Sequence, residues 1–373
     1  MSIEIKLPKW YDLHTHLRQD ALLPAVIQDH IKSGCAGVLA MPNTKPPVAK
    51  IHEHDPLPYW SIETYFQSIV QNGGQQFDQI IVPLYLTKDT TPEMIEVGAK
   101  SGLLKACKYY PPHGTTNSEH GCGFENFIQN GVFEAMQAHG IVLCVHGEQA
   151  GIDSAHYFGR DTNAEEAFYL DEMPKLHKYL PGLKIVCEHL TTKIATDFVL
   201  NSNENVAATV TPQHLLFNIA DLLQGLKYHL YCLPLLKFEQ DRLALLAAVT
   251  SGNNSKFFAG TDSAPHTQKA TACGCAAGCY TAPIAPQLYA KAFENSGLNL
   301  SGHKAQTLFR KFLCELGPKF YNFPISNEYF TLIKDQDSLT VTKTEQGDLT
   351  PLMVGLNVNH LSDGTQLDWR IKL

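Results

Sequence analysis

The sequence predicts an α/β fold in which eight parallel strands and their helices close into a TIM (β/α)8 barrel. The chain has 373 residues, a length that one such barrel can use as a single domain. Short apolar runs rich in Val, Ile and Leu recur along it, separated by amphipathic stretches. Continuous apolar strands that alternate with helices indicate a parallel sheet covered on both faces. Eight such units favour a closed barrel over the alternative, an open doubly wound sheet.

The predicted strands follow one another along most of the chain. In chain order they are Tyr11–His16, Gly37–Pro42, Gln79–Leu86, Leu103–Tyr110, Ile141–Glu148, Leu183–Leu190, Val206–Pro212 and Lys256–Pro265. Three of the stretches that follow these runs place apolar side chains on one face of a helix. These faces comprise Leu22, Leu23, Val26, Ile27 and Ile31, then Ile62, Tyr65, Phe66, Ile69 and Val70, then Phe124, Phe127, Ile128, Val132 and Ala135.

The last fifty residues depart from this pattern. Before them, no linker, low-complexity tract or charge block interrupts the chain. We therefore assign residues 1–321 to the barrel and residues 322–373 to a C-terminal extension of the same domain. The extension contains two strand-like pieces, Tyr329–Lys334 and Ser338–Lys343, which we expect to pack on the barrel.

Composition excludes several classes of protein. The chain has 29 Lys and Arg against 37 Asp and Glu, a formal net charge of −8, and it lacks a basic cluster, which argues against a nucleic-acid partner. No apolar run approaches the roughly 18–20 residues of a membrane span. The N-terminus has no apolar stretch typical of a secretory signal. We therefore expect a cytoplasmic protein without a membrane partner.

The ten cysteines indicate reduced thiols, because disulfide scaffolds are shorter and denser in cysteine. Cys273, Cys275 and Cys279 lack the paired C-x2-C spacing of common zinc modules, so a buried or tight-turn role is favoured over a thiolate cluster. Neither G-x-G-x-x-G nor G-x4-G-K-[ST] is present, so nothing supports binding of nucleotide phosphates.

Polar side chains stand at the carboxyl ends of the predicted strands, where a strand with only a structural role would not require them. In a (β/α)8 barrel the carboxyl ends of the strands carry the active site. The residues at these ends are His14, His16, Asn43, Lys108, His146, His189 and Asp262.

Four imidazoles at one end of a barrel point to a transition metal such as zinc. His14 and His16 lie two residues apart on a strand, so both rings can face the same ion. Taken singly, each histidine could instead be hydrogen-bonded in the core, and Asp262 could be a turn residue. Lys108 lies among apolar residues, where an uncompensated charge costs several kcal/mol. It either extends to the strand end, meets a carboxylate, or is chemically converted to one.

The number of potential ligands suits two ions, since a mononuclear catalytic site uses three protein ligands. Two ions about 3.5–4 Å apart can share a bridging hydroxide, and such sites hydrolyse amides, imides or phosphate esters. Arg18, Asn43 and His266 lie near the metal residues in sequence. They could bind a substrate carboxylate, or they could form ordinary loop hydrogen bonds.

Several segments together resemble the short, bacterial-type dihydroorotases of the amidohydrolase superfamily. They are DLHTHLR, MPNTKPP, KACKYYPPHGTTNSEHG, CVHGE, CEHLTTK, TPQHL, LYCLPLLK and GTDSAPH, and they run in the expected order from residue 12 to about residue 285. The resemblance implies an amidohydrolase-type TIM barrel. It also implies the reversible interconversion of (S)-dihydroorotate with water and N-carbamoyl-L-aspartate in pyrimidine biosynthesis, and a homodimer.

The resemblance further implies two zinc ions per chain. His14, His16 and Asp262 would hold one ion, and His146 and His189 the other. Lys108, as N6-carboxylysine, would bridge both ions. Asp262 would be the general base toward the bridging hydroxide and then the acid toward the leaving nitrogen.

Substrate contacts also follow from the resemblance. Arg18, Asn43 and His266 match the family's carboxylate contacts, and the family pattern also places His146 against the substrate. The backbone of Leu233 matches the contact to the pyrimidine ring. The loop Pro111–His120 resembles a mobile lid, as its glycine and small polar residues suit, with the hydroxyls of Thr115 and Thr116 facing the substrate. The family's C-G-C-A-G is C-G-C-A-A-G here, so either Ala276 or Ala277 supplies the next backbone contact; we assign Ala277.

Three other functions compete with this interpretation. An amidohydrolase that acts on hydantoins would leave the Arg18, Asn43 and His266 group without a carboxylate. Phosphotriester hydrolysis fits the metals but gives Arg18 no role. An inactive barrel that only scaffolds a partner should have lost metal ligands, and all six candidate positions are intact.

Overall fold

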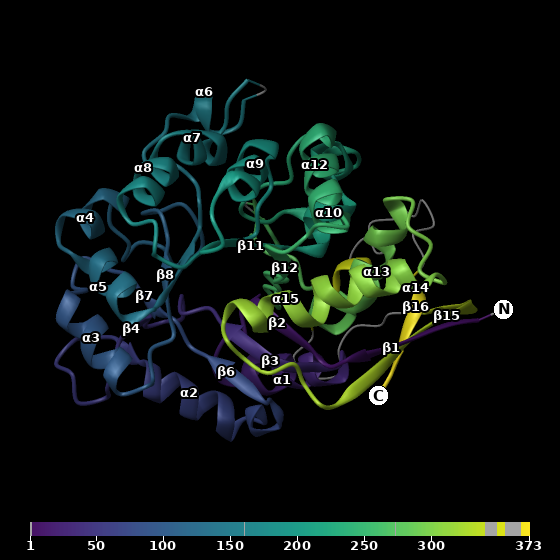
Figure 1. Cartoon of the computed structure of the whole chain (residues 1–373), viewed down its shortest axis with the longest axis horizontal. Helices are drawn as coiled ribbons and strands as arrows, with labels where there is room; N and C mark the ends of the chain where they lie inside the picture. The colour runs from purple at the N-terminus through teal and green to yellow at the C-terminus, as the bar shows by residue number, and fades with distance from the viewer. Residues whose placement is uncertain (1, 160, 273, 340–348, 355–366) are drawn as a thin grey trace.

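The computed structural model describes residues 2–159, 161–272, 274–339, 349–354 and 367–373. Parallel strands form its centre, and helices lie around the outside of these strands (Figure 1). The central strands are β2 (Trp10–Thr15), β3 (Cys35–Ala40), β6 (Gln79–Ile81), β7 (Leu84–Tyr85), β8 (Ala106–Tyr109), β9 (Val142–Val145), β10 (Ile185–Cys187), β11 (Val206–Val210) and β12 (Phe257–Ala259). Each of the eight predicted runs overlaps at least one of them.

The central strands pair in two groups. One group has the order β12-β11-β10-β9-β8-β7 and the other the order β2-β3-β6, and every pairing between neighbours is parallel. The predicted third strand is divided into β6, which pairs with β3, and β7, which pairs with β8. Pro83 lies between the two pieces and has no N–H to donate to a ladder. The third run therefore links the two groups.

Hydrogen bonds also join the first strand to the segment after the last one. The amide of Asp262 donates to the carbonyl of His14 at 2.8 Å, and the amide of His16 donates to the carbonyl of Ser263 at 3.0 Å. Thr15 and Ser263 form an isolated parallel bridge. The fold is thus α/β with a central parallel sheet, and its first and last strands contact each other.

Helices follow the strands as the periodicity predicts, with one difference. The first two predicted helical faces belong to α1 (Leu23–Lys32) and α2 (Ile62–Gln71), except that Leu22 ends the 3-10 turn before α1. The third belongs to two helices, α4 (Phe124–Gln129) and α5 (Val132–His139). Gly131 separates them with φ 80°, a left-handed conformation that glycine adopts without strain.

The remaining elements complete the outer layer and the connections. The other helices are α3 (Pro92–Lys100), α6 (Ser154–Tyr157), α7 (Ala164–Leu170), α8 (Glu172–Tyr179), α9 (Lys193–Asn201), α10 (Pro212–Leu216), α11 (Ile219–Leu223), α12 (Glu239–Thr250), α13 (Ala285–Asn295), α14 (His303–Arg310) and α15 (Leu316–Phe320). Short 3-10 turns are η1 (Asp20–Leu22), η2 (Gly74–Gln76), η3 (Tyr228–Leu230) and η4 (Ala282–Ile284), and a π-helix, η5 (Lys311–Glu315), joins α14 to α15. Two small strand pairs are β4 (Val48–Lys50) with β5 (Trp60–Ser61), and β13 (Ala270–Thr271) with β14 (Gly274–Cys275).

A separate antiparallel sheet unites the two ends of the chain. It has the order β1-β15-β16, formed by β1 (Ile3–Pro8), β15 (Tyr329–Leu339) and β16 (Leu367–Lys372). The sequence pattern did not predict β1. The predicted piece Tyr329–Lys334 lies within β15, whereas most of Ser338–Lys343 lies outside the described residues. The indole of Trp369 donates to Glu294 of α13 at 3.0 Å, so this sheet packs on the outer helices.

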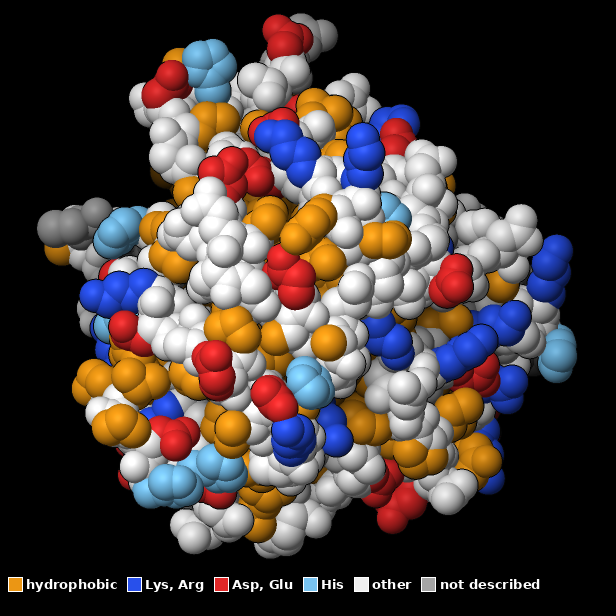
Figure 2. All heavy atoms as spheres, turned by 60° about the vertical axis from the view of Figure 1, so that its left-hand side comes forward, with side chains coloured by type: hydrophobic (Ala, Val, Ile, Leu, Met, Phe, Trp, Pro, Cys, Tyr) orange, Lys and Arg blue, Asp and Glu red, His pale blue; other side chains and the backbone are white. Residues whose placement is uncertain are grey.

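The surface carries charges of both signs (Figure 2), and the described cysteines are thiols. Figure 2 shows basic and acidic side chains interspersed over one face of the molecule. Among the described residues, none of the helices combines the length and the apolar character of a membrane span. The described cysteines are all free thiols, and most of them are buried.

Candidate metal centre and substrate pocket

Strand alternation brings Lys108 and His146 to the interior of the strand layer. On β8, Ala106 belongs to an inner apolar cluster, whereas Cys107 packs in the cluster between strands and helices. Lys108 therefore faces inward by the two-residue period. On β9, Cys144 faces inward in the same way, and His146 continues its side just past the strand end. Both polar side chains are buried.

An irregular pairing turns His14 and His16 inward. Along β2, Asp12 pairs with Val38, whereas Thr15 pairs with Ala40. Between these two pairs β2 advances by three residues and β3 by two, so β2 contains one extra residue. An extra residue of this kind reverses which side chains face each side of a sheet. Leu13 belongs to the inner cluster before the irregularity. After it, Thr15 contacts His30 of α1 at 3.0 Å, which leaves the flanking histidines facing inward.

Left-handed backbone conformations occur at three of the predicted site residues. The φ angles are 64° at Arg18, 40° at His189 and 48° at Asp262, a region that non-glycine residues rarely adopt. Alternation along β10 would turn His189 outward, because Val186 belongs to the inner cluster. The left-handed turn instead brings the His189 ring to 4.8 Å from the His14 ring.

His14, His16 and Asp262 form a compact group with the geometry of metal ligands. Their ligand atoms all lie within 4.8 Å of one another. Nε2 of His16 is 3.0 Å, and Nε2 of His14 is 3.4 Å, from the same Oδ1 atom of Asp262. Burial raises the pKa of Asp262, but the contacts with both histidines outweigh it and hold that pKa well below 3.8. Asp262 is therefore an anion that faces two ring nitrogens.

The remaining ligand candidates adjoin this group. The four imidazoles form a chain in which ring centroids are 5.8 Å apart for His16 and His14, 4.8 Å for His14 and His189, and 4.7 Å for His189 and His146. Nζ of Lys108 and Nδ1 of His189 are buried and have no hydrogen-bond partner among the residues that the structure describes. Buried polar atoms without partners are rare, so both atoms are suited to bind a metal or a group attached to one.

Two glutamates of this centre were not identified from the sequence. Glu188, completely buried, lies 2.7 Å from Nδ1 of His14 and accepts a hydrogen bond from Thr209. Glu148 lies 2.6 Å from Nε2 of His146. A carboxylate on one ring nitrogen orients the other toward a metal, which is the arrangement at His14. The signal in the sequence was a charged residue near a predicted ligand, since Glu188 directly precedes His189 and Glu148 follows His146 by two residues.

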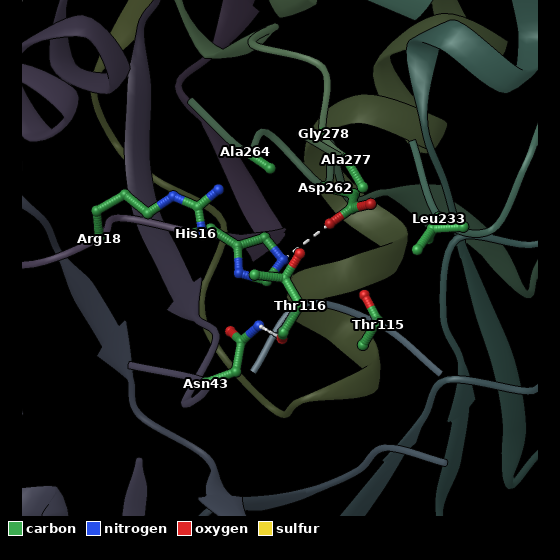
Figure 3. Close-up of a pocket in the computed structure, with 10 residues that line it drawn as sticks. All are labelled: His16, Arg18, Asn43, Thr115, Thr116, Leu233, Asp262, Ala264, Ala277 and Gly278. Carbon is green, nitrogen blue, oxygen red and sulfur yellow. Dashed lines mark hydrogen bonds and ion pairs between the residues drawn. The ribbon is translucent and has the colours of Figure 1, made fainter. Parts of the chain in front are cut away.

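A pocket opens beside the metal group and contains most of the predicted substrate contacts (Figure 3). Its lining comprises His16, Arg18, Asn43, Thr115, Thr116, Leu233, Asp262, Ala264, Ala277 and Gly278. Arg18 lies on one side of the pocket and Leu233 on the other (Figure 3). Ala277, rather than Ala276, is part of the lining.

Arg18 is held in place by neutral partners. Its Nε donates to the carbonyl of Pro265 at 3.0 Å, and one of its terminal nitrogens lies 3.1 Å from Nε2 of His266. Nε2 of His266 is also 2.7 Å from the carbonyl of Ala277. Burial and the Arg18 charge lower the pKa of His266 to about 4. Within the described part of the chain, Arg18 forms no ion pair, so its charge is available to a ligand.

The loop at residues 111–120 covers one side of the pocket. Asn43 donates from its Nδ2 to the carbonyl of Thr116 at 3.0 Å, and Asn117 donates back to the carbonyl of Asn43 at 2.9 Å. These bonds place Thr115 and Thr116 in the pocket lining.

Known proteins that are similar in sequence and fold identify the family of this chain. No family model matches the chain. A dihydroorotase from Picosynechococcus sp. is 42% identical over 336 residues, which cover 89% of this chain and 90% of that protein. The chain belongs to the dihydroorotase family. Dihydroorotases are hydrolases of cyclic amides, and this chain is an enzyme of that class.

Solved structures extend the comparison. Dihydroorotase from Saccharomyces cerevisiae, determined in complex with 5-fluoroorotic acid, has a TM-score of 0.82 and 27% identity over 99% of this chain and 98% of that one. The L-hydantoinase of Arthrobacter aurescens has a TM-score of 0.74 at 14% identity, over 98% of this chain and 82% of that one. At that identity the second likeness shows the amidohydrolase fold alone.

Proposed function

We propose that this dihydroorotase-family enzyme interconverts (S)-dihydroorotate and N-carbamoyl-L-aspartate in pyrimidine biosynthesis. The observation that carries the proposal is Arg18, a cation without an ion pair in the described structure, in the same pocket as His16 and Asp262. A guanidinium binds a carboxylate well. Dihydroorotate has one, whereas a simple hydantoin would leave Arg18 unpaired.

The donor set fits two zinc ions. His14, His16 and Asp262 would hold one ion and His146 and His189 the second, since imidazole and carboxylate are common zinc ligands. Burial lowers the pKa of Lys108 below 10.5, which favours the neutral amine that reacts with carbon dioxide. Its Nζ, without a hydrogen-bond partner in the described structure, would then carry a carboxylate that ligates both ions. When bound, the ions lower the pKa of water to the neutral range.

The side chains have the following roles in this proposal. Asp262 accepts a proton from the attacking water, which adds to the ring carbonyl carbon. The bond from that carbon to the ring nitrogen then breaks, and Asp262 returns the proton to the nitrogen. Arg18, Asn43 and His266 bind the substrate carboxylate. The hydroxyls of Thr115 and Thr116, with the backbone at Leu233 and Ala277 and the side chain of His146, complete the contacts with the substrate.

The wider organisation is part of the same proposal. The hydrogen bonds from Asp262 to His14 and from His16 to Ser263 support closure of the strands into one (β/α)8 barrel over residues 1–321. Residues 322–373 would extend the same domain. We also assign the enzyme to the cytoplasm, as a homodimer that acts on small molecules.

The first experiment measures metal content and dihydroorotate turnover on one purified sample. We expect close to two zinc ions per chain together with turnover. Two zinc ions without turnover would contradict the assignment of dihydroorotate as the substrate. Hydantoins and other ureides would then be the substrates to test. If the chain binds no metal after zinc and bicarbonate are supplied, the proposed metal-dependent activity is contradicted. The alternative of an inactive barrel that scaffolds a partner would then be favoured.

Lys108→Ala tests the metal bridge. We expect the variant to lose zinc and activity, because it removes the group that would bind both ions. Short carboxylic acids such as acetate should restore part of both, since they can occupy the space of the missing side chain. Zinc content by elemental analysis is the readout, and Lys100→Ala, at an exposed ion pair on α3, is the control. Unchanged zinc in Lys108→Ala would refute the bridge.

A further inference from the structure

A second cavity lies at the opposite end of the central strands from the metal group. It encloses about 300 Å³, at the lower end of the range typical of small-molecule sites. Leu104 and Lys105 line it just before β8, Ile141 and Val142 at the start of β9, and Lys184 just before β10. Lys105 precedes β8 and lies three residues before Lys108, which is roughly 10 Å at the usual rise of a strand. The cavity and the substrate pocket share no lining residue.

Aromatic side chains form one wall of this cavity. Phe320, Tyr321 and Phe323 come from the end of α15 and the segment after it. The rings of Tyr321 and Phe323 are nearly parallel, at 12° with centroids 6.2 Å apart. Leu104, Ile141 and Val142 add buried apolar residues to the same lining. Flat apolar surfaces of this kind suit a planar ring.

The polar part of the lining is basic. Lys105, His139 and Lys184 line the cavity, and none of its described lining residues is Asp or Glu. Nζ of Lys184 donates to the carbonyl of Phe320 at 3.1 Å and lies 5.4 Å from the centre of that ring. In the described part of the chain, neither lysine forms an ion pair. Such a basic group is unexpected in a chain of net charge −8, and it suits an anion.

We infer that this cavity binds a small planar aromatic anion, with its ring against Phe320 and Phe323 and its carboxylate or phosphate against Lys105 and Lys184. The inference goes beyond the proposed function and does not depend on it, because no residue of the substrate pocket takes part. Any effect of the bound anion on turnover would act through β8 and β9, which carry Lys108 and lead to His146 at their other ends.

Calorimetric titration of the zinc-loaded full chain tests the site. The probes are uridine 5′-monophosphate and salicylate, with uridine as the neutral counterpart of the first. We expect at least one anion to bind, and uridine to bind about tenfold more weakly than its monophosphate if the phosphate is the preferred group, because the lysines contribute charge-assisted hydrogen bonds. Binding of the monophosphate alone identifies a phosphate ligand, and binding of salicylate alone an aromatic carboxylate. Either result supports the site.

Variants separate the two pockets. Lys105→Gln combined with Lys184→Gln should weaken binding by about tenfold or more, whereas Arg18→Ala and the surface variant Lys100→Gln should leave it unchanged. Because Lys184 also holds the carbonyl of Phe320, the single variant Lys105→Gln, at an exposed position, provides a test that does not disturb that contact. Binding that is lost in Arg18→Ala and kept in the lysine variants would place the anion in the substrate pocket. That result, or the absence of binding at about 10 mM of either anion, would overturn the inference.

Discussion

At the scale of single residues, the site depends on backbone conformations that the side chains themselves disfavour. Arg18, His189 and Asp262 are all left-handed, which costs of order 1–3 kcal/mol each. Each is fixed by a hydrogen bond from a different part of the chain. Pro265 accepts from the side chain of Arg18, and Thr209 accepts from the amide of His189. These contacts offset the strain. They leave Arg18 and Asp262 in the pocket lining and His189 against His14.

Arg18→Ala should impair turnover without releasing the metal. The substitution removes the charged contact to the substrate carboxylate, which is worth about 1.5–3 kcal/mol, or roughly 10–150-fold in kcat/KM. Alanine keeps a Cβ at this left-handed position, so the backbone strain is unchanged. Steady-state kinetics with N-carbamoyl-L-aspartate and zinc analysis are the measurements, with Arg310→Ala, which breaks a pair with Glu315, as the control. An unaffected rate would show that Arg18 does not bind the substrate.

At the scale of elements, the pairing of β2 with β3 decides where the metal residues point. The irregular register between Asp12 and Thr15 turns both histidines inward. Earlier on the same pair, the ring of Tyr11 lies over Gly37 of β3. A Cβ at Gly37 would lie 2.5 Å from Cδ1 of Tyr11 and 2.9 Å from the carbonyl oxygen of Gln79. The absence of a side chain at Gly37 therefore allows β3 to lie between β2 and β6.

Gly37→Ala should destabilise the fold. The added methyl group has to displace a buried ring and a backbone carbonyl, and overpacking of this kind costs about 1–3 kcal/mol. Urea unfolding followed by circular dichroism gives the free energy of unfolding. Gly252→Ala is the matched control, because no atom lies within 4 Å of its Cβ position, and we expect it to change stability by less than about 0.5 kcal/mol. Equal stability of both variants would show that the Tyr11 ring moves aside freely.

At the scale of the whole molecule, buried histidines link the stability of the fold to pH. His214 is buried, with Nδ1 2.7 Å from the hydroxyl of Thr211 and Nε2 3.1 Å from the carbonyl of Pro234. A neutral ring satisfies both contacts by accepting at Nδ1 and donating from Nε2. Burial and the nearby charge of Lys237 lower the pKa of His214 from 6.5 to about 4. The unfolded chain therefore binds a proton at this residue at a higher pH than the folded chain does.

The stability that His214 contributes should fall as the pH falls from about 6.5 toward about 4. Between these values the unfolded state holds more protons, so the free energy of unfolding rises with pH. We expect a loss of about 2 kcal/mol between pH 7 and pH 5 from this residue. Urea unfolding at both pH values should show a smaller loss in His214→Gln than in the wild type. His54→Gln, with its side chain 83% exposed, should behave as the wild type does, and equal losses in all three would contradict the assignment.

The local features of this protein can be read from its amino-acid sequence. The order of the central strands follows from the apolar runs, although the third run is divided into β6 and β7. The polar residues at the strand ends follow from where those runs stop. Pairs such as His14 and His16 share a face through strand geometry alone. The family could be identified because its motifs are short and continuous in sequence.

Contacts between distant parts of the chain become visible only in the folded protein. His16 meets Asp262 across 246 positions, and His14 meets Glu188 across 174. No local pattern specifies such pairs, because they arise from how the strands pack. The irregular register of β2, the inward turn of His189 and the pairing of β1 with β15 have the same origin. The availability of the Arg18 charge to a ligand has the same origin, because the fold decides whether a carboxylate lies beside it.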